Sequence, residues 1–119
     1  MPGPILIFST PIAPAEVLRL ADLWFGDMVK FVVDLGARRI ALGGELHADA
    51  EERLLDAGGR QEDLWGGNYY PGRPAGERVE FTALINIRPS QGNRSMELLD
   101  PELRAQVGAL ALALIEGGR

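Results

Sequence analysis

The spacing of hydrophobic residues changes from a helical period to a strand period just after Gly26, and this change constrains the fold most strongly. Before Gly26, apolar side chains recur every three or four residues, which predicts a helix from about Pro14 to Phe25. After it, apolar residues alternate with other residues from Val29 to Leu35, which predicts a strand with one strongly apolar face. Helices and strands are therefore expected to share one core.

Similar patterns predict the remaining elements. The further strands are expected at Ile5–Phe8, Arg39–Gly43, Leu64–Tyr70 and Val79–Arg88. The further helices are expected at Ala50–Ala57, with Asp49 as its N-cap, and at Pro101–Ile115, with Asp100 as its N-cap. Alternation is clearest from Val79 to Arg88, and Pro89 should end the pairing there because proline donates no hydrogen bond.

The resulting order is strand, helix, strand, strand, helix, strand, strand, helix. This order lacks the regular alternation that a parallel sheet requires. It predicts a single α+β domain over residues 1–119, with a largely antiparallel sheet of four or five strands and helices packed mainly on one face. The first six elements follow the order of a ferredoxin-like unit, although the second helix is short for that fold.

The composition narrows the possible functions. The chain has no cysteine, which excludes disulfides, thiolate metal sites and a cysteine nucleophile. Its net charge of -5 argues against general nucleic-acid binding, because neutralising phosphates requires basic surfaces. There is no recognisable signal peptide, and no apolar run approaches the ~20 residues of a membrane span, so we expect a cytoplasmic protein without membrane association. Common phosphate-loop and serine-hydrolase motifs are absent, and no cofactor is indicated.

The segment from Asn86 to Ser95 carries an unusual density of hydrogen-bonding side chains between the expected last strand and last helix. Two guanidinium groups beside amide donors suit an anionic or highly polar ligand. The candidate ligand-binding residues are Asn86, Arg88, Ser90, Gln91, Asn93 and Arg94. The alternative is structural: the arginines would pair with nearby carboxylates, and the Asn and Ser side chains would satisfy the loop's own backbone.

A second group of candidates lies around the single histidine. If this stretch is extended, Glu45 and His47 point to the same side and Asp49 joins them. His47 with Glu45 is a candidate catalytic pair, and Glu45, His47 and Asp49 form a candidate metal site. The alternative is a structural histidine at the start of a helix. If the ligand reading holds, Glu45 and His47 should complete a pocket with the Asn86–Ser95 loop.

Aromatic residues flank two glycines in the stretch from Leu64 to Tyr70. Trp65, Tyr69 and Tyr70 are suited to a ligand pocket or to an interface with a partner. The more frequent role of such residues is to cover the sheet, which is the interpretation we favour.

Three long segments of the sequence are distinctive. They run from Gly26 to Asp34, from Ala41 to Glu51 and from Ile85 to Ser95, with Gln61–Gly66 between the last two. Through these segments the chain resembles a family of short bacterial proteins known only as a domain of unknown function. The resemblance extends from about Pro11 to Ile115 and implies no activity, cofactor or catalytic residue.

Three classes of function follow from these observations. The first is a binding module for an anionic or polar small molecule. The second is a metal- or histidine-dependent hydrolase that uses His47. The third is an interaction protein, such as a homodimer, with the Asn86–Ser95 loop in its interface.

Overall fold

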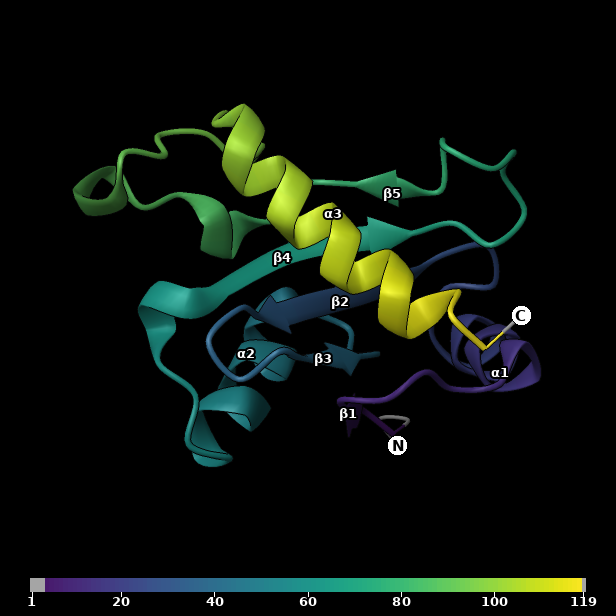
Figure 1. Cartoon of the computed structure of the whole chain (residues 1–119). Coiled ribbons are helices and arrows are strands. Elements are labelled where there is room, and N and C mark those ends of the chain that lie inside the picture. The colour runs from purple at the N-terminus through teal and green to yellow at the C-terminus, as the bar shows by residue number, and fades with distance from the viewer. Residues whose placement is uncertain (1–3, 119) are drawn as a thin grey trace.

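The computed structural model describes residues 4–118, and these form a five-stranded sheet with helices on both faces (Figure 1). All neighbouring strands are antiparallel. Their order across the sheet is β1 (Leu6–Phe8), β3 (Arg39–Leu42), β2 (Val29–Asp34), β4 (Leu64–Tyr69) and β5 (Val79–Glu80). The helices are α1 (Pro14–Trp24), α2 (His47–Asp56) and α3 (Pro101–Ile115). The predicted α+β class, with an antiparallel sheet, is confirmed.

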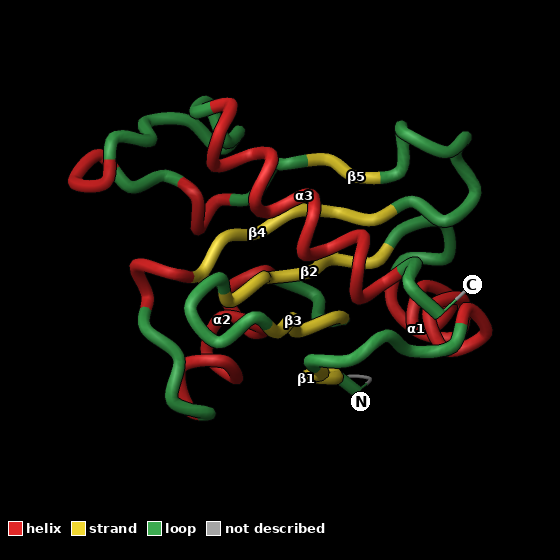
Figure 2. Tube along the Cα trace, in the orientation of Figure 1, coloured by secondary structure: helices red, strands yellow, loops and turns green. Residues whose placement is uncertain are grey.

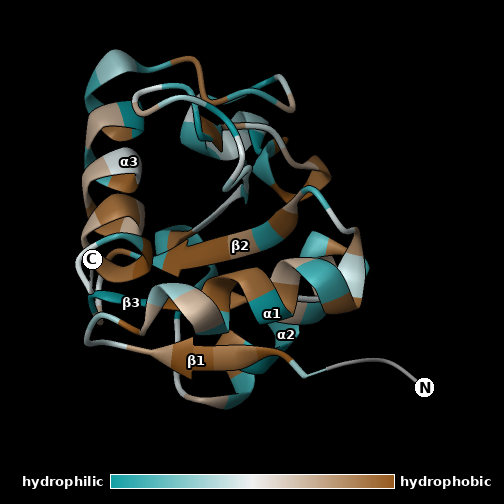
Figure 3. Ribbon diagram, turned by 90° about the vertical axis from the view of Figure 1, so that its right-hand side faces the viewer, coloured by the Kyte–Doolittle hydropathy of each residue, from teal (hydrophilic) through white to brown (hydrophobic). Residues whose placement is uncertain are grey.

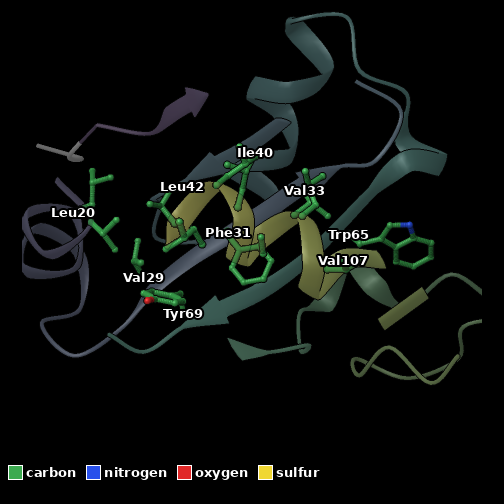
Figure 4. Close-up of a cluster of buried hydrophobic side chains, with 14 of the residues drawn as sticks. Leu20, Val29, Phe31, Val33, Ile40, Leu42, Trp65, Tyr69 and Val107 are labelled. Carbon is green, nitrogen blue, oxygen red and sulfur yellow. The ribbon is translucent and has the colours of Figure 1, made fainter. Parts of the chain in front are cut away.

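Helices α1 and α3 cover one face of the sheet and enclose the main core. Along β2, the alternate residues Val29, Phe31 and Val33 reach this face and are fully buried. Figure 4 shows these side chains between Leu20 of α1 at one end of the cluster and Trp65 of β4 at the other. In the view along the side of the molecule, the apolar surfaces of α1 and α3 line this interior (Figure 3). No helix within residues 4–118 is both long and apolar enough to cross a lipid bilayer.

Helix α2 lies on the opposite face, behind the sheet in Figure 1. It packs on a smaller cluster of buried residues: Val32, Ala41, Ala50, Leu54 and Leu64. The chain reaches this face through Gly43 and Gly44, whose φ angles of 115° and 108° lie in the region that favours glycine. A Cβ atom on Gly43 would lie 2.7 Å from the Pro4 carbonyl oxygen, so a larger residue would not fit there.

The turn between β2 and β3 is held by Asp34. This carboxylate is buried, accepts a hydrogen bond from the Ala37 amide at 3.0 Å and forms an ion pair with Arg39 at 3.1 Å. Arg38 lies in this turn with a positive φ of 55°. The predicted hairpin from Val29 to Gly43 is therefore confirmed, with β3 ending at Leu42.

The predicted start of the second helix is wrong. Helix α2 begins at His47 instead of Ala50, and its N-cap is Leu46 instead of Asp49. Asp49 lies in the first turn, where its Oδ2 accepts a hydrogen bond from the Leu46 amide at 3.3 Å. This carboxylate satisfies an amide at the helix start from inside the helix, which is why the capping residue itself needs no polar side chain.

The long predicted strand from Val79 to Arg88 is also wrong. Strand β5 contains only Val79 and Glu80, and two short 3-10 helices follow, at Leu84–Asn86 and Pro89–Gln91. Figure 2 shows that most of the segment between β5 and α3 is loop. In place of a continued ladder, the Asn86 carboxamide pairs with the Gly66 peptide of β4. Its Nδ2 donates to Gly66 O at 2.9 Å, and its Oδ1 accepts from Gly66 N at 2.9 Å.

Candidate functional site

A cavity of about 360 Å³ lies on the α2 face of the sheet, beside the start of α2. Its volume is at the lower end of the range for small-molecule pockets. Its walls come from β2, β4, the start of α2 and the segment after β5: Met28, Lys30, Leu46, His47, Ala48, Asn68, Thr82, Ala83, Leu84, Ile85 and Met96. Most of these side chains are apolar. We refer to this space as the His47 cavity.

The sheet supplies two polar side chains to the cavity floor. Lys30 of β2 and Asn68 of β4 are directly opposite each other in the antiparallel ladder, and both point to the α2 face. The Lys30 Nζ lies 5.2 Å from the centre of the Phe25 ring and forms no ion pair with a described residue. Asn68 is only 9% exposed, and its Nδ2 donates to Glu80 Oε1 at 3.3 Å and to Thr82 O at 3.4 Å.

His47 is the first residue of α2 and is 9% exposed. Its Nε2 lies 2.8 Å from the Gly67 carbonyl oxygen. Because a carbonyl only accepts hydrogen bonds, Nε2 carries the proton, and in the neutral ring Nδ1 keeps a lone pair. Within the described chain, Nδ1 forms no hydrogen bond. His47 can therefore act as a hydrogen-bond acceptor or a base through Nδ1 while Nε2 stays fixed.

The electrostatic surroundings keep this imidazole neutral. Burial lowers the pKa of His47, and the positive charge of Lys30 lowers it further. The hydrogen bond to Gly67 and the Asn68 side chain act in the opposite direction and raise this pKa. The Asn68 Oδ1 nevertheless does not reach hydrogen-bond geometry with the ring, and it is buried without a partner. The site thus contains a buried acceptor that the chain leaves unsatisfied.

Gly66 lets the wall of the cavity approach the sheet closely. A Cβ atom at this position would lie 2.7 Å from Ala83 Cβ and 3.1 Å from His47 Cδ2. A side chain on Gly66 would therefore push α2 and the segment after β5 away from β4. This packing explains a glycine in the middle of a central strand.

The polar side chains of the Asn86–Ser95 segment mostly bind the chain's own backbone. Asn86 is fully buried on Gly66, and the Nδ2 of Asn93 donates to three carbonyl oxygens, those of Asn86, Ser95 and Glu97. The Gln91 Nε2 donates to Glu62 O at 3.0 Å. Ser90 and Arg94 are exposed and form no hydrogen bond or ion pair that the described residues provide. None of the six predicted ligand residues lines the His47 cavity.

Arg88 joins this segment to the start of β4. Arg88 is 9% exposed, and its guanidinium stacks 3.8 Å from the centre of the Trp65 ring and donates to the carbonyl oxygens of Gln61 and Leu64. Glu51 of α2 lies close enough for the two charges to interact. Burial raises the pKa of Glu51, while Arg88 and Gln61 lower it in part. The Glu51 Oε2 atom is buried without a hydrogen-bond partner.

The structure separates Glu45 and Asp49 from His47. The stretch is not extended, since His47 already belongs to α2, and the two carboxylates line a different cavity together with Trp24. Within residues 4–118, no group of three or more His, Asp or Glu side chains lies close enough to hold a metal ion. His47 shares its cavity with Ala83, Ile85 and Met96, which lie just before and just after the Asn86–Ser95 segment, and no residue of that segment lines the cavity.

The aromatic residues of β4 have different positions. Trp65 and Tyr69 are 3% and 1% exposed and belong to the main core, as the sheet-covering interpretation predicts. Tyr70, the residue after β4, is partly buried, donates to Glu80 Oε1 at 3.0 Å and stacks with Arg73.

Sequence reasoning missed Lys30, Asn68 and Thr82 as cavity residues. A signal existed for Lys30: it is the one basic residue inside an otherwise apolar strand pattern, on the face opposite Phe31. For Asn68 and Thr82 no such signal existed, because their positions depend on the pairing of β4 with β2 and on the path of the chain after β5.

Comparison with known proteins places the chain in a family. The family described as "Protein of unknown function (DUF5674)" matches residues 6–114, and the chain belongs to it. The resemblance identified from the sequence is thereby confirmed. No curated protein and no solved structure matches the chain.

Proposed function

We propose that this protein binds a small molecule in the His47 cavity. The observation that carries the proposal is a cavity of about 360 Å³ with apolar walls and a few polar groups. Small-molecule sites commonly have this construction, in which apolar walls supply affinity and a few polar groups fix orientation. The polar groups are Lys30, Asn68 and Nδ1 of His47, and none of them is fully used by the chain itself.

The proposed ligand site is therefore the His47 cavity and not the Asn86–Ser95 loop. Four of the six loop candidates already bind backbone or side-chain groups of the chain, so a ligand would have to break those hydrogen bonds: Asn86, Arg88, Gln91 and Asn93. The loop then has a supporting role, because Asn86 and Arg88 hold the cavity wall against β4.

The test is a small-molecule screen on ¹⁵N-labelled protein at neutral pH. Binding compounds should shift the backbone amide signals of Ala48, Asn68 and Met96. Ala48 is exposed at the cavity wall, so Ala48→Trp should block binding without disturbing the core. Ala109→Trp, at an exposed position of α3 outside the cavity, is the matched control and should bind normally. Binding that survives Ala48→Trp, or no binding by any compound, would contradict the proposal.

A histidine-dependent hydrolase is the second candidate. The observation that favours it is the neutral His47 imidazole, with Nε2 fixed on Gly67 O and Nδ1 without a hydrogen bond within the described chain. An imidazole with a lowered pKa can accept a proton from water at neutral pH. In this mechanism Gly67 would orient the ring, in place of the expected Glu45. Hydrolysis of ester probes that is lost in His47→Ala, but kept in Glu45→Ala, would support this function; equal rates in all three proteins would exclude it.

A further inference from the structure

We infer that the ligand of the His47 cavity is a carboxylate with a compact apolar body, and that Lys30 pairs with its charge. This inference rests on the proposed function and names the chemical class that the cavity selects. The apolar body would contact the side chains that make up most of the wall, among them Met28, Ile85 and Met96. The carboxylate would lie beside the Lys30 ammonium, which is the one cationic donor among the described residues that line the cavity.

The charges around the cavity support an anionic ligand. The chain has 17 acidic and 12 basic residues, so acidic side chains are in excess over the whole molecule. Among the described residues that line this cavity, however, there is no Asp or Glu, and Lys30 is the one side chain with a permanent charge. The Glu80 carboxylate of β5 accepts a hydrogen bond from Asn68, and it is also held by Tyr70 and Arg73.

Lys30 is available to pair with a ligand. Its Nζ lies 5.2 Å from the centre of the Phe25 ring, and no described carboxylate is within ion-pair distance. A cation beside an aromatic ring is weakly held compared with a cation in a buried ion pair. A ligand carboxylate can therefore bind Lys30 without displacing a competing acid from the protein.

The start of α2 also favours an anionic ligand. Leu46, His47 and Ala48 line the cavity, and the helix is ten residues long. Backbone amides in the first turn of a helix lack partners within the helix and favour negative charge, a preference that the Asp49 carboxylate on the Leu46 amide meets in part. Asn68, nine-tenths buried at the same cavity, has an Oδ1 atom without a hydrogen-bond partner among the described residues. A hydroxyl or amide on the ligand, or a bound water, would supply the missing donor.

The test compares two probes of nearly equal shape, phenylacetate and phenylacetamide. Their affinities are measured by titration of ¹⁵N-labelled protein at neutral pH and low salt. The wild-type protein should bind phenylacetate about three- to tenfold more tightly, as expected for one partly buried ion pair. Raising the salt concentration should reduce this preference, because salt screens the interaction.

Three variants test whether the preference for phenylacetate comes from Lys30. Lys30→Met keeps the aliphatic part of the side chain and removes the charge, so both probes should then bind equally. Arg38→Met removes one positive charge from the β2–β3 turn, at the opposite end of β2, and should keep the wild-type preference. Lys30→Arg should keep it as well, and dispersed amide spectra would show that each variant is folded.

The possible outcomes separate this inference from the proposed function. Equal binding of the two probes to the wild type, or a preference that survives Lys30→Met, would overturn the carboxylate inference and leave the cavity proposal intact. The same holds if neutral compounds bind and phenylacetate does not. If no compound in the screen binds, both proposals fail.

Discussion

The two faces of the sheet are built from the same strands but are filled in different ways. On the α1 and α3 face, Phe31 and Tyr69 are almost completely buried, and the space between sheet and helices is occupied by large apolar side chains. On the α2 face, the neighbouring positions Lys30 and Asn68 are polar, and a cavity of about 360 Å³ remains. We infer that the filled face supplies most of the stability, while the other face keeps a cavity with apolar walls and a few polar groups.

Two adjacent glycines of β4 show how this difference arises. A Cβ atom on Gly67 would lie 2.4 Å from the Phe31 ring, so this glycine makes room for a core side chain. Gly66 points to the other face and makes room for His47 and Ala83. The same residue type thus permits dense packing on one face and close approach of the cavity wall on the other.

The largest loss of stability is expected from a substitution on the α1 and α3 face. Phe31→Ala should destabilise the protein by about 3–5 kcal/mol, because a fully buried ring is replaced by an empty space. Urea unfolding followed by tryptophan fluorescence measures this loss. Phe25→Ala is the matched control: Phe25 is 40% exposed, so it should cost about 1 kcal/mol or less. If the two variants lost similar amounts of unfolding free energy, the α1 and α3 face would not be the main source of stability.

A smaller but still large loss of stability is expected where the Asn86 side chain pairs with Gly66 of β4. Asn86→Ala removes the side chain that pairs with Gly66 N and O and also donates to Met96 O. We expect a loss of about 2–4 kcal/mol in urea unfolding, because these buried backbone groups lose their partners. Asn68→Ala is the control within β4. It should cost less than about 1 kcal/mol, since its two hydrogen bonds are long, at 3.3 and 3.4 Å.

The imidazole of the α2 face should make stability depend on pH. The pKa of His47 in the folded protein is lowered from 6.5 by burial, so the unfolded chain binds a proton more readily. This contribution to stability is fully present above pH 6.5 and is lost as the pH falls toward the lowered folded pKa. His47→Gln keeps an N–H donor for Gly67 O but does not titrate, so its unfolding free energy should change less between pH 7 and pH 5. Equal pH profiles would contradict the lowered pKa.

Glu51 should also make stability depend on pH, but more weakly and in the opposite direction. Burial raises its pKa above 4.5 in the folded protein, so its charged form destabilises the fold as the pH rises through the raised value. Glu51→Gln should therefore stabilise the protein slightly at neutral pH, by less than about 1 kcal/mol, because the site is partly exposed. The gain should disappear near pH 4. A loss of stability at neutral pH would mean that the attraction to Arg88 exceeds the cost of burial.

The smallest change in stability is expected at Arg94, which lies outside both faces of the sheet. This side chain is exposed and has no hydrogen bond or ion pair from the described residues, so Arg94→Glu should change stability by less than about 0.5 kcal/mol. Its mass in solution and its binding of phenylacetate should match the wild type. A dimer that is present in the wild type and lost in Arg94→Glu would instead support the interaction hypothesis.

Local sequence patterns determined most of the regular structure. Alternation from Val29 to Leu35, helical spacing in α1 and α3, and the Asp100 cap with Pro101 after it were sufficient to predict the hairpin, two helices and the α+β class. These features depend on neighbouring residues and on which side of an element is apolar, so the sequence alone contains the information. His47, which the sequence also singles out as a candidate, lines the cavity that we propose as the ligand site.

Tertiary structure decided the rest. The alternation from Val79 to Arg88 predicts a strand, yet the buried Asn86 side chain pairs with Gly66 and takes the place of further ladder hydrogen bonds. Arg88 and its neighbours looked free to bind a ligand, but carbonyl groups distant in the sequence occupy them. Lys30, Asn68 and His47 meet only because β2 pairs with β4 and α2 packs behind both. A side chain's partner is set by contacts between remote segments, and local periodicity carries no information about those contacts.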